Sequence, residues 1–373
     1  MRQRPHPAVA AATAAIAGPA LALAALSPAA RAQPDTVHHG WHVIRVAGGK
    51  NSALDAAVAP AGGPGWIGGS SSGATPVLYR AAGTWPVTHL AGNAGAFVQS
   101  LSATSRTNVW AALENEPAVA YLTSHGWRTH SIAIGSDDLL ESGVVTFSPK
   151  DTWVFAFDFT AQKSYAWHDT HAGWKRTVVP YEIDAFSNVG EVSGTSDGNI
   201  WALGGTAGVS GSLRFNGKTW QAISFPAGIV PSGQVAQPKE ILAESPSNVW
   251  ATVYTAAGKR AGPLVLLHWD GTRWREVTGK NVPDDVLTGP IASDGAGGLW
   301  LAAENPAYTR PLLLHYTGSG RWATDQVPAD GGKPLEVTAL ASGPGSRDLL
   351  ATAIVGAGGF GASTSSAVLA YTP

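Results

Sequence analysis

A pair of tryptophan motifs recurs along nearly the whole chain and limits the folds that it can adopt. The first motif is typified by Ser-Pro-Ser-Asn-Val-Trp-Ala-Thr at residues 245–252, with Trp250 as its aromatic residue. The second is typified by His-Trp-Asp-Gly-Thr-Arg-Trp at residues 268–274, which ends in Trp274. Successive copies of either motif are 42 to 54 residues apart, which is the length of one four-stranded blade of a β-propeller. The repeat therefore predicts an all-β propeller.

The number of motif copies predicts the number of blades. The first motif occurs at seven positions, which are Trp66, Trp110, Trp153, Trp201, Trp250, Trp300 and, without the indole, Leu350. The second motif ends at six positions, which are Trp85, Trp127, Trp174, Trp220, Trp274 and Trp322. Its missing seventh copy is supplied by Trp41, near the start of the chain. We therefore expect a seven-bladed β-propeller in which the N-terminal strand completes the C-terminal blade, which leaves no open sheet edge.

Each repeat reads as four short strands separated by turn residues. The fifth repeat is the clearest example: a short apolar inner strand at 240–244, a second strand around Trp250, a third at 264–269, then an Asp-Gly hairpin and a fourth strand around Trp274. Each blade must bury a face against its neighbour, and a large flat side chain covers that face well. We therefore interpret the repeated tryptophans as core residues.

The first 32 residues have the features of a secretory signal peptide. Arg2 and Arg4 precede an Ala/Leu-rich stretch at 8–27, and Ala30-Arg31-Ala32 places small residues where signal peptidase needs them. We predict cleavage before Gln33, an exported protein, and a single propeller domain over residues 33–373 with no membrane insertion after cleavage. The alternative is an uncleaved anchor, since the apolar stretch is about long enough to span a bilayer.

Composition excludes several classes of site and partner. The chain has no cysteine, which excludes disulfides, thiolate metal sites and a cysteine nucleophile. Removing the three arginines of the signal segment leaves 21 basic against 26 acidic residues. Because there is also no basic run, nucleic acid is not expected as a partner.

The two motifs also carry a family resemblance. The alternation of Ser-x-x-Asn-Val-Trp-Ala with Trp-Asp-Gly-x-x-Trp resembles the repeats of secreted bacterial, actinobacterial-type, seven-bladed β-propeller proteins of unassigned function. It covers nearly all of residues 33–373 and implies the fold, not an activity. The Asp-Gly-x-x-Trp elements are also similar to those of propeller lectins. The segments at 196–201 and 293–300 are similar to degenerate Asp-boxes of sialidase-like families, which are turn elements.

One face of the expected propeller should be acidic. Propellers usually bind ligands with the loops that join the second strand to the third and one blade to the next. In this chain those loops carry Glu114, Glu116, Asp137, Asp138, Glu141, Asp158, Glu182, Asp184, Asp284, Asp285, Glu304, Asp330 and Glu336. This surplus over the cations there favours cationic, sugar or calcium-bridged ligands, and improved solubility is the alternative explanation.

Two glutamates stand out because they occupy the same place in adjacent repeats. Glu191 and Glu240 each lie ten residues before a motif tryptophan, at the start of the inner strands of blades four and five. Such a pair suits binding of a cation or acid–base catalysis, and simple lining of a wet channel is the alternative. The further ligand-binding candidates on this face are Glu114, Glu141 and Asp184.

Histidine spacings suggest metal binding only superficially. The pairs His168/His171 and His39/His42 have the spacing of metal ligands, but they fall in outer hairpins of blades that are not neighbours, on the opposite face. A structural role is therefore favoured. No cofactor is expected, and calcium is the only ion that the acidic loops leave open.

The sequence favours binding over catalysis. It contains no Gly-x-Ser-x-Gly turn for a serine nucleophile and no arginine cluster near the channel. The leading hypothesis is a non-enzymatic binding or scaffold module outside the cell, with a carbohydrate or protein ligand on the acidic loop face. The alternative is a carbohydrate-active hydrolase or lyase that uses Glu191 and Glu240, which would then lie about 5 to 10 Å apart.

Overall fold

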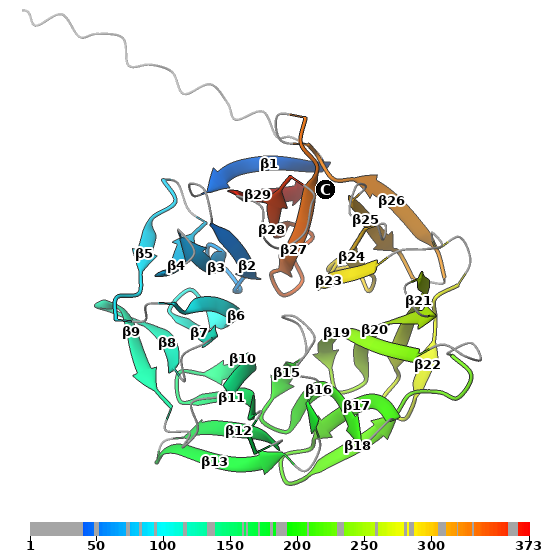
Figure 1. Ribbon diagram of the computed structural model, residues 1–373, viewed down its shortest axis with the longest axis horizontal. Coiled ribbons are helices and arrows are strands. Elements are labelled where there is room, and N and C mark those ends of the chain that lie inside the picture. The colour runs from blue at the N-terminus through cyan, green and yellow to red at the C-terminus, as the bar shows by residue number, and fades with distance from the viewer. Residues whose placement is uncertain are drawn as a thin grey trace, which may run out of the picture. The chain divides into compact units, whose positions relative to one another are not determined.

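Each tryptophan repeat folds into one antiparallel sheet, and seven such sheets are arranged around a common centre (Figure 1). The computed structural model describes residues 40–47, 52–71, 75–81, 84–92, 95–114, 118–132, 139–158, 160–161, 163–170, 172–179, 182–183, 192–206, 209–229, 235–257, 260–279, 282, 287–304, 311–318, 320–329, 332–356 and 365–373. All of them belong to one compact unit, His38–Pro373. The predicted signal peptide lies outside the described residues. Among those residues, no helix is both long enough and apolar enough to cross a bilayer.

The blades follow one another along the chain, each with its first strand nearest the centre (Figure 1). Blade 1 consists of β2 (Ala53–Val58), β3 (Trp66–Ser71), β4 (Thr75–Arg80) and β5 (Val87–His89). Blade 2 consists of β6 (Phe97–Ser105), β7 (Asn108–Glu114), β8 (Ala118–Thr123) and β9 (Gly126–Ser131). Blade 3 consists of β10 (Leu139–Ser148), β11 (Asp151–Asp158), β12 (Lys163–Thr170) and β13 (Gly173–Val179). Blade 4 consists of β14 (Glu182–Ile183), β15 (Val192–Ser196), β16 (Asn199–Thr206), β17 (Val209–Phe215) and β18 (Trp220–Ser224).

Blades 5 to 7 continue the same order. Blade 5 consists of β19 (Val235–Ser245), β20 (Asn248–Ala257), β21 (Arg260–Trp269) and β22 (Trp274–Glu276). Blade 6 consists of β23 (Leu287–Ser293), β24 (Leu299–Glu304), β25 (Pro311–Tyr316) and β26 (Trp322–Gln326). Blade 7 consists of β27 (Leu335–Ser342), β28 (Leu349–Val355), β29 (Ser365–Thr372) and β1 (Gly40–Ala47). The seven-bladed fold predicted from the repeat is thus confirmed.

Two details of the strands differ from the sequence prediction. The inner strand of blade 5 is much longer than the apolar core at 240–244, because β19 also pairs residues 235–238 with β20. In blade 1 the fourth strand does not carry its motif tryptophan. Trp85 has a left-handed φ of 54°, and β5 begins only after Pro86, which has no N–H to donate to the ladder.

Tryptophans of neighbouring repeats meet across four of the blade boundaries, and at two others the indole packs against a phenylalanine or tyrosine ring, as in Trp220–Phe155 and Trp250–Tyr316. The second-strand indole of one blade packs edge-on against the fourth-strand indole of the next. The ring centroids are 5.1 Å apart for Trp66–Trp127, 6.0 Å for Trp110–Trp174, 5.6 Å for Trp201–Trp274 and 5.7 Å for Trp300–Trp41. Edge-to-face pairs at this distance add about 0.5–1.5 kcal/mol each beyond the area that they bury. The predicted core role is confirmed for the six first-motif tryptophans and Trp274, which are buried, whereas the remaining second-motif tryptophans are half-buried.

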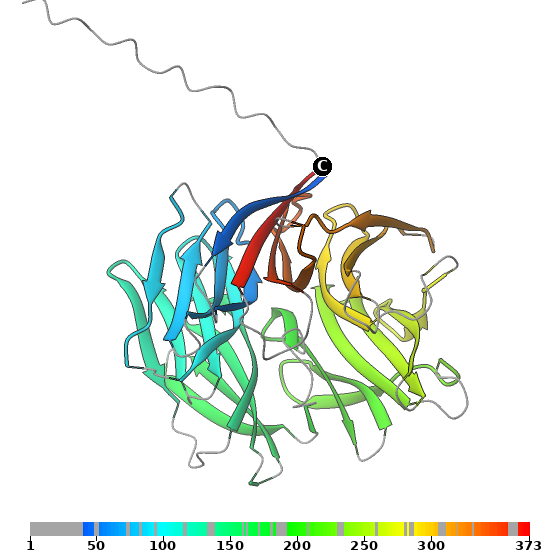
Figure 2. The same cartoon turned by 45° about the horizontal axis from the view of Figure 1, so that its top comes forward.

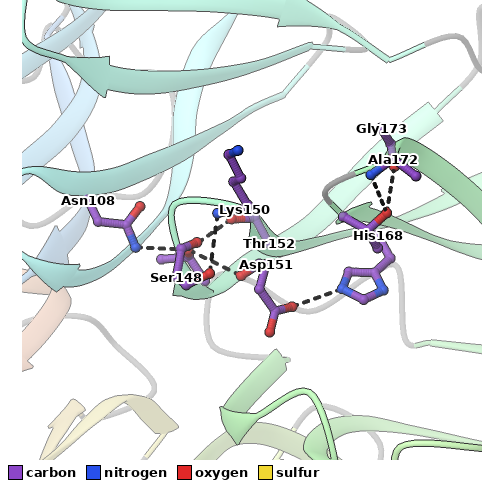
Figure 3. Close-up of polar contacts among 10 residues, drawn as sticks. Asn108, Ser148, Lys150, Asp151, Thr152, His168, Ala172 and Gly173 are labelled. Atoms are coloured by element: carbon purple, nitrogen blue, oxygen red, sulfur yellow. Dashed lines mark hydrogen bonds and ion pairs between the residues drawn. The ribbon is translucent and has the colours of Figure 1, made fainter.

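One of the histidines with metal-like spacing, His168, also serves this packing, whereas His39 and His171 lie outside the described residues. His168 lies across the β11–β12 ladder from Trp153, stacks on it at 4.0 Å, and its Nε2 is 2.8 Å from Asp151 Oδ1 (Figure 3). On the neighbouring blade, Asn108 Nδ2 donates to Thr146 Oγ1 at 3.2 Å. His268 and His315 repeat the stack on the tryptophans of blades 5 and 6, so the described histidines of this series are structural.

The ring closes through the N-terminal strand. β1 pairs antiparallel with β29 from Gly40↔Thr372 to Ala47↔Ser366, and the blue and red strands lie side by side in both views (Figures 1 and 2). Trp41 packs against Tyr371 at 5.3 Å in its own blade and against Trp300 in blade 6. The closure predicted from the missing seventh motif is therefore confirmed.

Candidate functional site

A β-bulge interrupts the inner strand at the same place in most blades. In blade 1 the register shifts between Leu54 and Ala56, and in blade 5 it shifts between Pro238 and Glu240. Both shifts lie opposite the residues two and three positions after the motif tryptophan. Equivalent shifts occur in β6, β10, β23 and β27. A bulge bends its strand and changes the direction of a side chain. Each of these repeats therefore contains an inner-strand residue that has no partner on the second strand.

Bulge residues of five blades line a cavity among the inner strands. The cavity has a volume of about 470 Å³. Five bulge side chains line it, namely Asp55, Gln99, Lys239, Pro290 and Thr338. It lies where the inner strands begin and the second strands end, which is the face that the sequence analysis predicts for ligand contact.

The structure brings two of the predicted candidates together in this cavity. Glu240 lines it from blade 5 and Glu114 lines it from the end of β7 in blade 2. Glu141 pairs with Ala156 in the β10–β11 ladder, but its side chain lies outside the described part of the chain. Glu191 and Asp184 also lie outside it, so the expected Glu191–Glu240 separation stays a prediction.

The strand register supports the sequence equivalence of Glu191 and Glu240. Val192 pairs with Ala202, one residue after Trp201. Ile241 pairs with Ala251, one residue after Trp250. Each glutamate directly precedes one of these paired inner-strand residues in the sequence.

Sequence reasoning missed Asp55 and Gln99. Counting ten residues back from the motif tryptophan finds Glu191 and Glu240, whereas counting eleven back finds the bulge position itself. That count yields Asp55, Gln99 and Lys239 from Trp66, Trp110 and Trp250. The bulge position can therefore be found from the repeat, and it lies one residue before the position that Glu191 and Glu240 occupy.

Three carboxyl groups form one side of the cavity, which we call the acidic side: Asp55, Glu114 and Glu336. They come from blades 1, 2 and 7, which are consecutive around the ring. Burial, followed by the nearby Glu336, raises the pKa of Asp55 to about 6. Burial, followed by the charge of Asp55, raises the pKa of Glu114 to about 7. Burial also raises the pKa of Glu336. Within the described part of the chain, no positive charge lowers the pKa of any of the three carboxyl groups.

Glu240 sits in a different environment on blade 5. Its side chain is only 6% exposed, and burial raises its pKa well above the usual range although the neighbouring Lys239 opposes that shift. The cavity lining thus contains four carboxyl groups and one ammonium group. In the described part of the chain, no three histidine, aspartate or glutamate side chains are grouped closely enough to hold a metal ion.

Ten buried side-chain nitrogen and oxygen atoms have no hydrogen-bond partner in the described part of the chain, and two of them are oxygens at this cavity. These two are Oε1 of Gln99 and Oγ1 of Thr288, on residues that are 6% and 8% exposed. Leaving a buried polar group unpaired costs about 1–3 kcal/mol, and such groups are rare in native structures. A hydrogen-bond donor that enters the cavity would remove this cost at Gln99, whose carbonyl oxygen can only accept.

Hydroxyl groups tie neighbouring inner strands together beside the cavity. Thr338 donates from Oγ1 to the backbone oxygen of Leu54 at 2.6 Å, which links blades 7 and 1. Ser100 accepts from the backbone N–H of Val144 at 3.3 Å, which links blades 2 and 3. The first of these bonds joins the two strands that carry Asp55 and Glu336.

Comparisons with known proteins support the fold. No family model and no curated protein matches the chain. Among solved structures, it is similar to YCF48 from Cyanidioschyzon merolae, with 14% identity, a TM-score of 0.60, and coverage of 90% of this chain and 99% of that chain.

Two further solved structures match less closely. A mutant of the Aleuria aurantia lectin in complex with Fucα1-6GlcNAc has 12% identity, a TM-score of 0.45 and coverage of 75% of this chain and 97% of that chain. A protein of unknown function from Dyadobacter fermentans has 12% identity, a TM-score of 0.44 and coverage of 89% of this chain and 98% of that chain. The similarity to YCF48 is one of fold alone, and the number of blades follows from the seven sheets of this chain.

Proposed function

We propose that this chain is a non-enzymatic binding module that acts outside the cytoplasmic membrane and takes its ligand at the cavity among the inner strands. The export follows from the signal-like segment at residues 1–32. The location of the site follows from the cavity on the predicted loop face. A carbohydrate or a segment of a protein is the expected ligand.

One observation carries the proposal. A cavity of about 470 Å³ is lined by side chains from five blades and contains two buried oxygen atoms without partners. Small-molecule sites are concave and combine apolar lining with a few convergent polar groups. The cost of raised carboxyl pKa values and unpaired oxygens is typical of a site that is completed by a ligand.

Glycoside cleavage by Glu191 and Glu240 is the alternative function. Glu240 lines the cavity and has the raised pKa that a general acid needs. Its proposed partner lies outside the described residues, so no observed distance supports a catalytic pair.

The first experiment is a binding screen of residues 33–373 against glycan and peptide arrays, with and without calcium. Any ligand found is then titrated by calorimetry into wild type, into the cavity variant Asp55→Asn/Glu114→Gln, and into the control Asp270→Asn, whose hairpin lies on the opposite face. We expect affinity to fall in the cavity variant only. Equal affinity in all three proteins would refute a site at the cavity.

The same screen separates binding from catalysis. Bound glycans are incubated with wild type and with Glu191→Gln/Glu240→Gln, and the products are analysed by mass spectrometry. A binding module leaves every glycan intact. Cleavage by wild type that the double variant abolishes would establish the alternative in place of the proposal.

A further inference from the structure

The side of the cavity formed by blades 1, 2 and 7 is rich in hydrogen-bond acceptors. The acidic side supplies three carboxyl groups from consecutive blades, and Gln99 adds an unpartnered carbonyl oxygen from the bulge of blade 2. Lys239, the one cation among the lining residues, belongs to blade 5, which is not adjacent to these blades. Charge and hydrogen-bonding capacity are therefore distributed unevenly around the cavity.

We infer that the acidic side together with Gln99 forms a subsite for an organic cation, a primary ammonium or guanidinium group carried by the ligand. The inference rests on the proposed function, because it assigns a ligand chemistry to the same cavity. An ammonium group has three donors and no acceptor. It therefore complements ionised carboxylates and the Oε1 of Gln99, and it satisfies an oxygen that otherwise stays unpaired.

Electrostatics favours a positive charge at this position. Burial and, to a smaller extent, the charge of Glu336 destabilise the anion of Asp55, and burial and, to a smaller extent, the charge of Asp55 destabilise the anion of Glu114. A cation among them turns three unfavourable charges into favourable pairs, and charge-assisted hydrogen bonds are roughly twice as strong as neutral ones. A neutral sugar would donate hydroxyl hydrogens without relieving this repulsion.

The cavity volume fits an organic group. About 470 Å³ lies within the range of roughly 300–1,000 Å³ that small-molecule pockets occupy. Phe97 also lines the cavity from the start of β6, where an aromatic ring can contact the alkyl or sugar part of a ligand or stack beneath its charge. The carboxylates would then bind the charged end, while the remaining volume holds the uncharged part.

Binding of a cation at this subsite should be coupled to the release of protons from the carboxyl groups. The charged groups that face the cavity are Asp55, Glu114, Glu240, Glu336 and Lys239. Because the pKa values of Asp55 and Glu114 are about 6 and about 7, part of the population is protonated near neutral pH. A bound cation favours the ionised form, so binding releases protons and weakens as the pH falls below 6.

Matched ligands test the inference in calorimetric titrations of wild-type residues 33–373. The pairs are glucosamine against glucose, and a lysine-containing tripeptide against the same peptide acetylated on its side chain, with putrescine as a free diamine. We expect each cation to bind at least about tenfold more tightly than its neutral partner, because hydrogen bonds to charged groups contribute more. Whether putrescine, glucosamine or the lysine peptide binds most tightly identifies the source of the cationic group.

Proton release provides a readout that requires no variant. Titrations at pH 7 in two buffers of different ionisation enthalpy should give different apparent enthalpies, and the affinity at pH 5 should be lower than at pH 7. Asp55→Asn/Glu114→Gln should abolish both effects, whereas Gln99→Leu should weaken binding without removing the proton release. Circular dichroism and unfolding curves show whether each variant is folded.

The possible failures are distinguishable. Glucose binding as tightly as glucosamine, with loss in the cavity variant, would overturn the cation subsite and leave the proposed binding function intact. Calcium binding in the absence of any amine binding would also overturn it. If ligands found by the array screen are unaffected by every cavity variant, the proposed function fails as well.

Discussion

The blade boundaries and the cavity are built from the same repeat, but they use it in opposite ways. At the boundaries, equivalent positions carry the same residue type, as in the tryptophan pairs Trp66–Trp127 and Trp201–Trp274. At the bulge, equivalent positions differ from blade to blade, with Asp55, Gln99 and Lys239 among them. The shared positions make the ring, and the divergent position makes a site that no single blade contains.

The two regions also differ in what they do to stability. The indoles at the boundaries bury large apolar areas and stabilise the ring. The cavity holds carboxyl groups whose pKa values are raised, so their ionisation opposes folding at neutral pH. Changes at the boundaries should therefore destabilise the fold, and changes in the cavity should stabilise it while removing ligand binding.

Deleting the closing strand should have the largest effect. Without residues 33–47, β29 loses its partner β1 and exposes an unpaired edge, and Trp300 loses its contact with Trp41. We expect aggregation or a protein that does not fold, because an open edge pairs with other chains. Size-exclusion chromatography and thermal unfolding measure this directly. A soluble monomer with unchanged unfolding temperature would show that closure is dispensable.

A buried boundary indole should come next. Trp201 is fully buried, packs against Trp269 and Trp274, and lies under the guanidinium of Arg214. Trp201→Ala should lower the free energy of unfolding by about 3–5 kcal/mol, the range for large aromatic truncations. Urea denaturation provides the value. Trp220→Ala is the matched control, and its cost should be smaller because this indole is only half-buried.

The same contrast explains which features were predictable from the sequence. Blade number and closure follow from the spacing of large residues, because each blade boundary buries a large side chain and such residues recur every 42 to 54 positions. The bulge could not be read from apolar periodicity. Residues 97–100 read as a continuous strand, and only the hydrogen-bond ladder shows that Gln99 has no partner residue opposite it. The repeat predicts a strand at Trp85, whereas Pro86 after it has no N–H to donate to the ladder, so the chain turns there instead.

The meeting of the cavity residues was also beyond sequence reasoning. Glu114 was expected on the acidic face, but its proximity to Asp55 depends on how blades 1 and 2 are positioned around the ring. A single repeat contains no information on that geometry. Glu336, from blade 7, lies close to Asp55 in space and far from it in the sequence, and only ring closure brings them together.

In the cavity, neutralising one carboxylate should stabilise the protein. The pKa of Asp55 is raised from 3.8 to about 6, so the folded state binds the proton more tightly than the unfolded state. Its stability contribution is present at low pH and is lost as the pH rises from about 4 to about 6. Asp55→Asn should therefore be more stable than wild type by about 3 kcal/mol at pH 7.5.

Below pH 4 this difference should vanish, because the carboxyl group is then protonated in both states. Urea unfolding at pH 7.5 and pH 4 provides the comparison. Lower stability of Asp55→Asn than of wild type at pH 7.5 would mean that the carboxylate is already compensated by a positive charge, which contradicts an uncompensated acidic side.

The smallest effect is expected at a charged residue that belongs to neither region. Asp270 starts the β21–β22 hairpin, where its Oδ1 accepts from the backbone N–H groups of Thr272 and Arg273, and its Oδ2 accepts from Arg275 Nε at 2.6 Å. Asp270→Asn keeps an oxygen for the turn and loses only an exposed ion pair. Exposed pairs contribute little because water and salt screen them. We expect no resolvable change in urea midpoint at pH 7 and none in ligand affinity. A clear loss of stability would show that hairpin charges, and not the boundary indoles alone, hold the outer strands in place.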